Sequence, residues 1–298
     1  MHLSISSLEF ADDSLAAEAA LFRGDIDFVS GNHVTPYLWV ARGRPIVCLA
    51  SPGNTVRDRV ITREPVASLA EFKDKGLRIA DSDLLRHHGH TAHGRANHIL
   101  EVMREGYEPG EAEWIEVGQP EEPGFQASLL AAVGSGRADA AFVSRQRGAT
   151  EPAGVHFLDL PTLPMINGTT ITTSYEVLNK KEGLADRLVR AMVETIHYAR
   201  MHPERAQQLL DTKMDRPYAE HGGRAAGVAS FPMKPYPTQE GIANAFELCR
   251  MQYEESQAIS PIALWDMHYL RSLDLSGFID ELIQEQEANA RQHPGPHS

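Results

Sequence analysis

Short apolar runs alternate with stretches of helical periodicity along the first half of the chain. Runs of this kind, bounded by turn residues, are typical of buried strands. They lie at residues 3–10, 26–29, 45–50, 60–62, 77–80, 114–117, 140–143, 155–158 and 169–173. Apolar side chains recur at helical spacing at residues 15–22, 36–41, 69–75, 91–105 and 126–133. This alternation favours an α/β fold with mostly parallel sheets.

From Leu184 onward the pattern becomes mostly helical. The predicted helices cover residues 185–201, 203–210, 239–256, 264–270 and 278–290. Prolines and glycines are frequent in residues 216–237, which predicts a long loop there. We expect the polar tail, residues 292–298, to be disordered.

The stretch 77–106 combines a predicted strand, a polar turn rich in histidine and a predicted helix. The helix begins near Thr91, and Gly106 is a suitable residue to end it. The first backbone N–H groups of a helix have no helical partner, and the helix dipole favours negative charge beside them. The pattern therefore predicts that this turn forms one wall of a small-ligand cleft.

Composition narrows the class of protein. The 298 residues are enough for one large domain or two smaller ones. With 28 Lys plus Arg against 41 Asp plus Glu, the net charge of −13 argues against a nucleic-acid partner but leaves room for a locally positive cleft. No run of about 18 apolar residues occurs, so we expect no membrane span. Cys48 and Cys249 are too few for a disulfide framework, and we expect buried free thiols.

Five segments carry a resemblance to a known family. They are residues 17–29, 42–47, 66–80, 89–106 and 185–210. The third of them, for example, reads VASLAEFKDKGLRIA, a helix start followed by Lys-Gly and a strand. The ordered set resembles the sulfonate-, taurine- and nitrate-binding proteins, a family with the type II periplasmic binding-protein fold that also contains the thiamine-pyrimidine synthases.

The resemblance implies two α/β lobes joined by crossing strands, with the ligand in the cleft between them. The implied lobes are 1–64 plus 168–298 (lobe 1) and 65–167 (lobe 2), with crossings at 60–63 and 169–173. The fold normally opens with a further strand and helix, and we expect that this first strand–helix unit is missing from the sequence. Ligands of such folds bind beyond the carboxyl ends of strands, at the starts of helices.

Polar residues at the predicted strand ends are the candidate ligand-binding residues. They are Asn32, His33, Asn54, Gly89, His90, Thr91, Arg145 and Asn167. Arg145 is suited to bidentate pairing with a carboxylate, sulfonate or phosphate. For each candidate the alternative interpretation is an ordinary surface turn. We expect Asp27 and Asp139, which precede strands, to be structural.

The histidine cluster leaves a metal site open as an alternative. Its members are His87, His88, His90, His93 and His98. Because no His-Glu-x-x-His motif, nearby cysteine or well-spaced carboxylate accompanies them, we predict no metal and no cofactor. For His93 and His98 the alternative interpretation is a position that faces solvent. No nucleophile-elbow, phosphate-loop or dinucleotide motif occurs, and the cysteine-rich motif of the pyrimidine synthases is absent, so we assign no catalytic residue.

Two functions remain open. The first is a solute-binding protein that closes its lobes around a small anionic organic ligand and delivers it to the permease of an ABC-type importer. The second is a metal-assisted or acid–base enzyme on the same fold, such as a decarboxylase of an aromatic acid or a cofactor-biosynthesis enzyme. The expected location is periplasmic or extracytoplasmic if the natural N-terminus carries a signal, and cytoplasmic otherwise.

Overall fold

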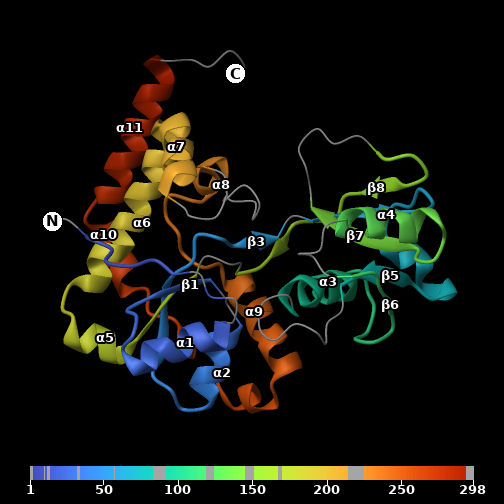
Figure 1. Cartoon of the computed structure of the whole chain (residues 1–298), viewed down its shortest axis with the longest axis horizontal. Coiled ribbons are helices and arrows are strands. Elements are labelled where there is room, and N and C mark those ends of the chain that lie inside the picture. The colour runs from blue at the N-terminus through green and yellow to red at the C-terminus, as the bar shows by residue number, and fades with distance from the viewer. Residues whose placement is uncertain are drawn as a thin grey trace.

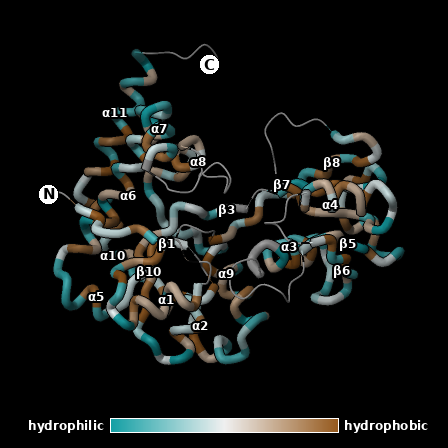
Figure 2. The backbone as a smooth tube through the Cα atoms, viewed as in Figure 1, coloured by the Kyte–Doolittle hydropathy of each residue, from teal (hydrophilic) through white to brown (hydrophobic). Residues whose placement is uncertain are grey.

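Two α/β lobes lie on either side of a short two-stranded ribbon in the computed structural model (Figure 1). The structure describes residues 3–9, 11, 14–31, 34–56, 58–82, 92–118, 124–144, 151–166, 170–213 and 225–292. Figure 2 shows hydrophobic stretches along the strands inside both lobes and hydrophilic residues at the outer loops. Within the described ranges, no helix is long and apolar enough to cross a membrane.

Lobe 1 is built on a three-stranded sheet in the order β1-β10-β2. Its strands are β1 (Val29–Gly31), β10 (Thr170–Ser174) and β2 (Ile46–Ala50), and β10 runs antiparallel to both neighbours. All five residues of β2 are buried. Val47 and Leu49 pack against helices on one face, whereas Ile46 and Cys48 belong to the core on the other face. Helices therefore cover both faces of this sheet.

The helices of lobe 1 fall into two groups around that sheet. One group packs on the Ile46 face: α1 (Ser14–Arg23), α2 (Thr35–Ala41), α9 (Gln239–Gln252), η2 (Glu254–Ala258) and η3 (Pro261–Leu264). The other group covers or extends from the opposite face: α5 (Tyr175–Lys180), α6 (Leu184–Met201), α7 (Pro203–Lys213), α8 (Ala225–Ser230), α10 (His268–Leu275) and α11 (Phe278–Gln292). Helix α8 lies within residues 216–237, so a short helix interrupts the loop-rich stretch predicted there.

Lobe 2 contains a five-stranded mixed sheet in the order β6-β5-β7-β4-β8. The strands are β4 (Asp58–Thr62), β5 (Arg78–Asp81), β6 (Glu113–Glu116), β7 (Ala140–Ser144) and β8 (His156–Leu158). Strand β5 is parallel to β6 and β7, whereas β4 is antiparallel to β7 and β8. The 3₁₀ helix η1 (Leu69–Lys75) and helix α3 (Ala92–Arg104) pack on one face, and α4 (Phe125–Gly134) packs on the other.

Helix α3 packs into the cores of both lobes. Val102 belongs to the core of lobe 2. Ala96 and Leu100, on another face of the same helix, belong to the lobe 1 core together with Ala245 and Phe246 of α9. Residues four apart share a helix face, which places Ala96 and Leu100 together and Val102 elsewhere on the helix.

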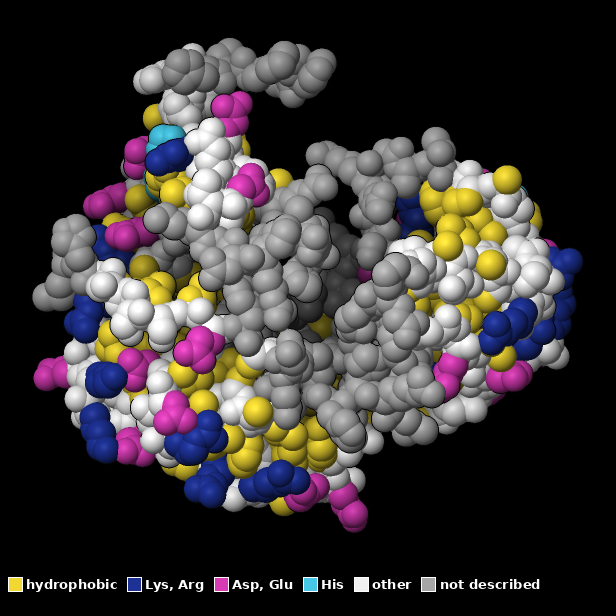
Figure 3. All heavy atoms as spheres, viewed as in Figure 1, with side chains coloured by type: hydrophobic (Ala, Val, Ile, Leu, Met, Phe, Trp, Pro, Cys, Tyr) yellow, Lys and Arg dark blue, Asp and Glu magenta, His cyan; other side chains and the backbone are white. Residues whose placement is uncertain are grey.

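The ribbon between the lobes consists of β3 (Thr55–Val56) and β9 (Leu163–Pro164), paired antiparallel. The chain leaves the carboxyl end of β2, passes through β3 and enters β4. Because β4 is antiparallel to β7, and β7 is parallel to β5, the carboxyl ends of β5 and β7 also point toward the ribbon. The two sheets thus present their carboxyl edges to each other. Figure 3 shows Lys, Arg, Asp and Glu side chains spread over the outer faces of both lobes.

Several expectations from the sequence need correction. The sheets are mixed rather than mostly parallel, because β4 and β10 both run away from the ribbon while β1, β2 and β7 run toward it. Residues 60–63 and 169–173, expected to cross between lobes, instead lie largely in β4 and β10. Residues 3–9 form no strand. The lobe bounds 1–64, 65–167 and 168–298 stay a prediction, and the strand pairings favour connections a few residues earlier.

Candidate functional site

The carboxyl edge of the lobe 2 sheet, where β5 ends and α3 begins further along the chain, is the described part of the predicted ligand cleft. Of the eight predicted ligand-binding residues, Asn32, His33, Gly89, His90, Thr91, Arg145 and Asn167 lie outside the described residues, as do His87 and His88. Their contact with a ligand stays a prediction.

Asn54, the eighth predicted residue, is described and lies in the turn between β2 and β3. Its side-chain Nδ2 donates hydrogen bonds to the carbonyls of Ser51 at 2.9 Å and Tyr236 at 2.7 Å. Its Oδ1 accepts a hydrogen bond from the Thr238 backbone N–H at 3.1 Å. These bonds use both amide N–H groups and tie the start of the ribbon to the start of α9. Ligand contact by Asn54 stays a prediction, because nothing in the structure tests it.

A histidine held between two carboxylates joins three elements at this edge. His98 of α3 lies with Nδ1 2.6 Å from Oδ2 of Asp81, the last residue of β5. On the other side of the ring, Nε2 lies 3.4 Å from Oδ2 of Asp58, the first residue of β4. The ring stacks on Phe142 of β7, with centroids 4.1 Å apart and planes 5° from parallel. Its side chain is 12% exposed, so the alternative that His98 faces solvent is wrong.

The two carboxylates shift the pKa of His98, and His98 in turn shifts that of Asp81. Burial lowers the pKa of the His98 ring, but the charge of Asp81 and hydrogen bonds to both carboxylates outweigh burial and raise the pKa to about 9. Burial also acts to raise the pKa of Asp81, yet the charge and hydrogen bond of His98, with the Ser82 N–H, bring it below its ordinary value. At neutral pH the His98 ring is therefore an imidazolium that donates from both nitrogens.

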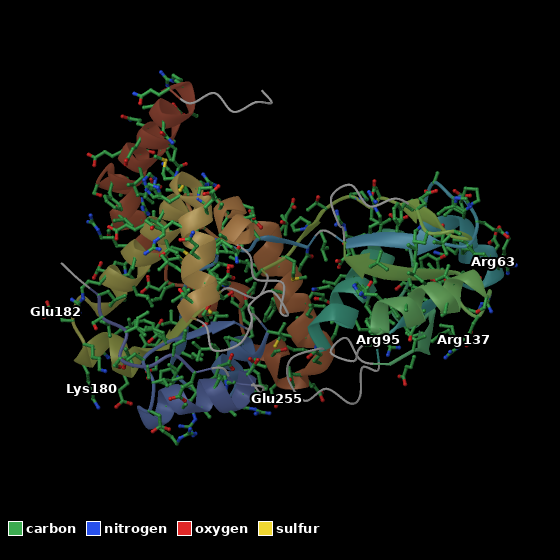
Figure 4. All side chains as sticks on the ribbon, turned by 45° about the horizontal axis from the view of Figure 1, so that its top comes forward. Arg63, Arg95, Arg137, Lys180, Glu182 and Glu255 are labelled. Atoms are coloured by element: carbon green, nitrogen blue, oxygen red, sulfur yellow. The ribbon has the colours of Figure 1, made fainter. Side chains whose placement is uncertain are left out.

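A buried arginine holds the residue that follows β5. Arg95, in the first turn of α3, donates from Nη1 to the Ser82 carbonyl at 2.9 Å and lies 3.4 Å from the Glu116 carboxylate. Its guanidinium lies over the Trp114 ring, with the central carbon 5.0 Å from the ring centroid. The side chain is only 8% exposed. Arg95 thus fixes the backbone of Ser82, just before the turn that the sequence predicts to bind ligand. Figure 4 shows Arg95 in the half of lobe 2 that is nearer to lobe 1.

One further carboxyl group near His98 titrates close to neutral pH. Glu101 of α3 is 4% exposed, and burial raises its pKa to about 7 against the charges of Arg104 and His98. The Arg104 guanidinium, 3.9 Å away, is too distant and too exposed to neutralise the carboxylate fully.

Three buried side-chain atoms in the described residues have no hydrogen-bond partner: Arg95 Nε, Asn97 Oδ1 and Thr170 Oγ1. Arg95 and Asn97 lie in the first two turns of α3. Thr170 is the first residue of β10 and pairs with Gly31 at the carboxyl end of β1. All three therefore lie at the two edges that face the ribbon. A buried polar atom without a partner costs about 1–3 kcal/mol, and such atoms tend to mark functional positions.

Local patterns in the sequence did not predict Asp58, Asp81 or Arg95 as site residues. Their partners lie between 13 and 40 residues away along the chain, so local spacing gives no signal for them; an aspartate and a serine directly after a buried strand were the one available hint. Asp139 accepts hydrogen bonds from Arg78, and Asp27 from Lys181, as expected for structural aspartates. Within the described residues, no group of three His, Cys, Asp or Glu side chains is arranged to hold a metal ion.

Comparison with known proteins identifies the fold. No protein-family model and no curated protein matches the sequence. The periplasmic sulfonate-binding protein SsuA from Methylobacillus flagellatus matches with a TM-score of 0.58 and 14% identity over 88% of this chain and 79% of that one. The aliphatic sulphonate binding protein SsuA from Escherichia coli matches with a TM-score of 0.52 and 18% identity over 84% and 82% of the two chains.

A third structure is the ligand-binding component of an ABC-type import system from Staphylococcus aureus, with zinc bound. It matches with a TM-score of 0.51 and 14% identity over 88% of this chain and 85% of that one. At these identities the likeness defines the fold. The chain has the two-lobed α/β fold of type II periplasmic binding proteins, of the kind seen in the sulfonate-binding proteins of ABC importers.

Proposed function

We propose that this protein is a solute-binding protein that delivers a small organic ligand with an acidic group to an ABC-type importer. One observation carries the proposal: the carboxyl edges of the two sheets face each other across the β3–β9 ribbon. In open α/β sheets this edge is where ligands bind. The solved structures with the same fold are named as binding proteins of ABC importers, which supports the same role here.

In this proposal the acidic group of the ligand binds the backbone N–H groups at residues 89–91 and pairs with Arg145. The lobes close by rotation about the ribbon, whose two short strands are the only paired strands between the two sheets in the described chain. Asn32, His33 and Asn167 would contribute from lobe 1 and the connection. The buried cations Arg95 and His98 lie at the same edge, but Asp58, Asp81 and Glu116 offset their charge, so in this proposal the anion depends on Arg145 and the backbone N–H groups.

The three buried atoms without partners fit the same proposal. They lie at both facing edges, where ligand binding with closure of the lobes would supply hydrogen-bond partners. In the free protein these unpartnered groups would then lower the free energy of unfolding, and ligand binding would remove part of that cost. A permease is the proposed partner, and an extracytoplasmic location follows from this role.

The enzyme alternative rests on the histidine cluster. His98, the member whose side chain the structure describes, is engaged on both ring nitrogens by carboxylates, so it is not available as an acid–base group. No observation favours the enzyme over the binding protein.

The proposal is tested by ligand screening on the purified chain. Native mass spectrometry would identify a co-purified small molecule, and isothermal titration calorimetry would measure binding of alkanesulfonates, aromatic acids and aliphatic acids, with and without a chelator. We expect one ligand per chain, binding unaffected by the chelator, and no turnover of the ligand by NMR. Turnover that the chelator abolishes would support the metal-assisted enzyme instead, and the absence of any bound acid would refute the anion-binding cleft.

Two pairs of variants sharpen the test. Arg145→Ala is expected to weaken binding about tenfold or more, as the loss of a charged hydrogen bond does, whereas Arg137→Ala, another lobe 2 arginine, is expected to leave it unchanged. Thr170→Val removes an unpartnered hydroxyl, so it should weaken ligand binding without lowering the stability of the free protein. Thr173→Val is the control, because the Thr173 hydroxyl donates to the Asp27 carbonyl at 2.7 Å; it should lower stability and not affinity.

A further inference from the structure

A cavity lies at the outer end of lobe 2, on the side of the sheet away from the ribbon. Its volume is about 300 Å³. The lining residues come from the segment after β4, from η1 and the glycine that follows it, from the start of β5 and from the residue before β7. They are Arg63, Glu64, Phe72, Lys75, Gly76, Arg78 and Asp139. Figure 4 shows Arg63 at this outer end. The cavity is therefore separate from the candidate ligand cleft.

Three cations line this cavity, and one of them is neutralised by a fixed partner. Arg78 donates from Nη2 to Asp139 Oδ1 at 2.7 Å and from Nε to Oδ2 at 3.0 Å. The Arg78 backbone N–H donates to the same carboxylate at 3.0 Å. The carboxylate of Asp139 is thus committed to Arg78, and it does not serve the other two cations.

Arg63 and Lys75 have no hydrogen-bond or ion-pair partner for their side chains among the described residues. The neighbouring carboxylate of Glu64 forms no ion pair with either of them. The Arg63 guanidinium instead lies against Gly136, where a Cβ atom would overlap it, at a backbone φ of +75° that already favours glycine. The bare glycine therefore gives room for the guanidinium to lie at the mouth of the cavity.

We propose that this outer cavity is a binding site for a small phosphate-bearing anion. The planar guanidinium of Arg63 suits bidentate bonding to phosphate oxygens, and the ammonium of Lys75 supplies a second point charge. The buried Phe72 forms an apolar part of the wall. A volume of about 300 Å³ is at the lower end of small-molecule sites, so the occupant is compact. The Glu64 carboxylate weakens the site and tunes its affinity.

The test is a titration of the full-length protein with inorganic phosphate and with a simple phosphomonoester at about 0.15 M salt, where remote surface charges are largely screened. Amide chemical shifts in a ¹⁵N-labelled sample report the location, and calorimetry reports the affinity. If both probes bind, the site recognises the phosphate group itself. If only the ester binds, the natural ligand is a larger phosphate compound. This site is independent of what the interlobe cleft binds.

Three variants decide the outcome. Arg63→Ala with Lys75→Ala is expected to weaken binding about tenfold or more, and Glu64→Gln is expected to tighten it several-fold by removing a repulsive charge. Arg137→Ala is the control, because this exposed arginine of the same lobe donates to the Glu116 carbonyl and does not line the cavity. The proposal is overturned if neither probe shifts amides around residues 63–78, or if the double variant binds as tightly as the control. Circular dichroism shows that each variant is folded.

Discussion

The imidazolium of His98 and the carboxylate of Asp81 form an ion pair with Nδ1 and Oδ2 2.6 Å apart, which fastens α3 to the carboxyl end of β5. The second ring nitrogen faces Asp58 at 3.4 Å, directly after the ribbon. One protonated side chain therefore fixes the position of the ribbon exit, the end of a central strand and the helix that follows the predicted ligand turn.

The stability of the protein is expected to fall on the alkaline side of neutrality. The pKa of His98 is raised from 6.5 to about 9 on folding. A raised pKa contributes stability that is fully present below the unfolded value and is lost as the pH rises through the folded value. The free energy of unfolding should thus fall between about pH 6.5 and 9, by up to roughly 3 kcal/mol. Urea denaturation at several pH values measures this, and His98→Gln should flatten the slope in that window.

The two carboxylates are expected to couple to His98 unequally. Asp81 is closer to the ring and its side chain is 6% exposed, whereas Asp58 is 25% exposed. Double-mutant cycles with His98→Gln and either Asp→Asn change should give a coupling energy of about 2 kcal/mol for Asp81 and below about 1 kcal/mol for Asp58. Equal couplings would show that the longer Asp58 contact is as strong as the shorter one.

Replacing Glu101 with glutamine is expected to stabilise the protein above neutral pH. Burial raises the pKa of Glu101 to about 7, so ionisation of this carboxyl opposes folding as the pH rises from 4.5 through 7. Glutamine keeps the shape and removes the charge. The thermal midpoint of Glu101→Gln should exceed that of the wild type at pH 8 and approach it at pH 4. A variant that is less stable at pH 8 would mean that the contact with Arg104 dominates.

Neither cysteine is expected to react in the folded protein. Burial raises the pKa of the Cys48 thiol well above its usual range, and it raises that of Cys249 to about 11. Both side chains are fully buried, and Cys48 Sγ lies 3.3 Å from the Thr172 hydroxyl. A thiol reagent that releases a chromophore should thus report no free thiol at pH 7 and two thiols in denaturant. Rapid modification of the native protein would show that the helices covering one of these thiols open and expose it to the reagent.

Local signals in the sequence predicted most helices and strands, because caps, turns and periodicity depend on residues that are close together along the chain. Ser68 caps η1 by accepting from the Ala70 N–H, and Gly106 ends α3 with a φ of +92°. Strands β3 and β9 escaped notice because two residues give no periodicity. The antiparallel pairing of β10 was not predicted, because a threonine-rich run indicates extended structure but does not identify the partner strand.

The buried polar groups were harder to predict than the elements. A histidine within a polar helix face is usually solvated, and nothing near His98 in the sequence shows that Asp58 and Asp81 converge on it. The same holds for Arg95, whose burial depends on Trp114 of a strand further along the chain. Long-range charge pairs of this kind become visible only when the sheet order is known.

Helix α3 gives Leu100 and Ala96 to the core of lobe 1 and Val102 to the core of lobe 2. Separating the lobes would therefore expose apolar surface on both pieces, and neither core would be complete alone. Although the chain has two sheets, heat or denaturant should melt it as one cooperative unit, with a single calorimetric transition. A rotation of one lobe against the other about the ribbon must then also move α3 relative to one of the two cores to which it contributes.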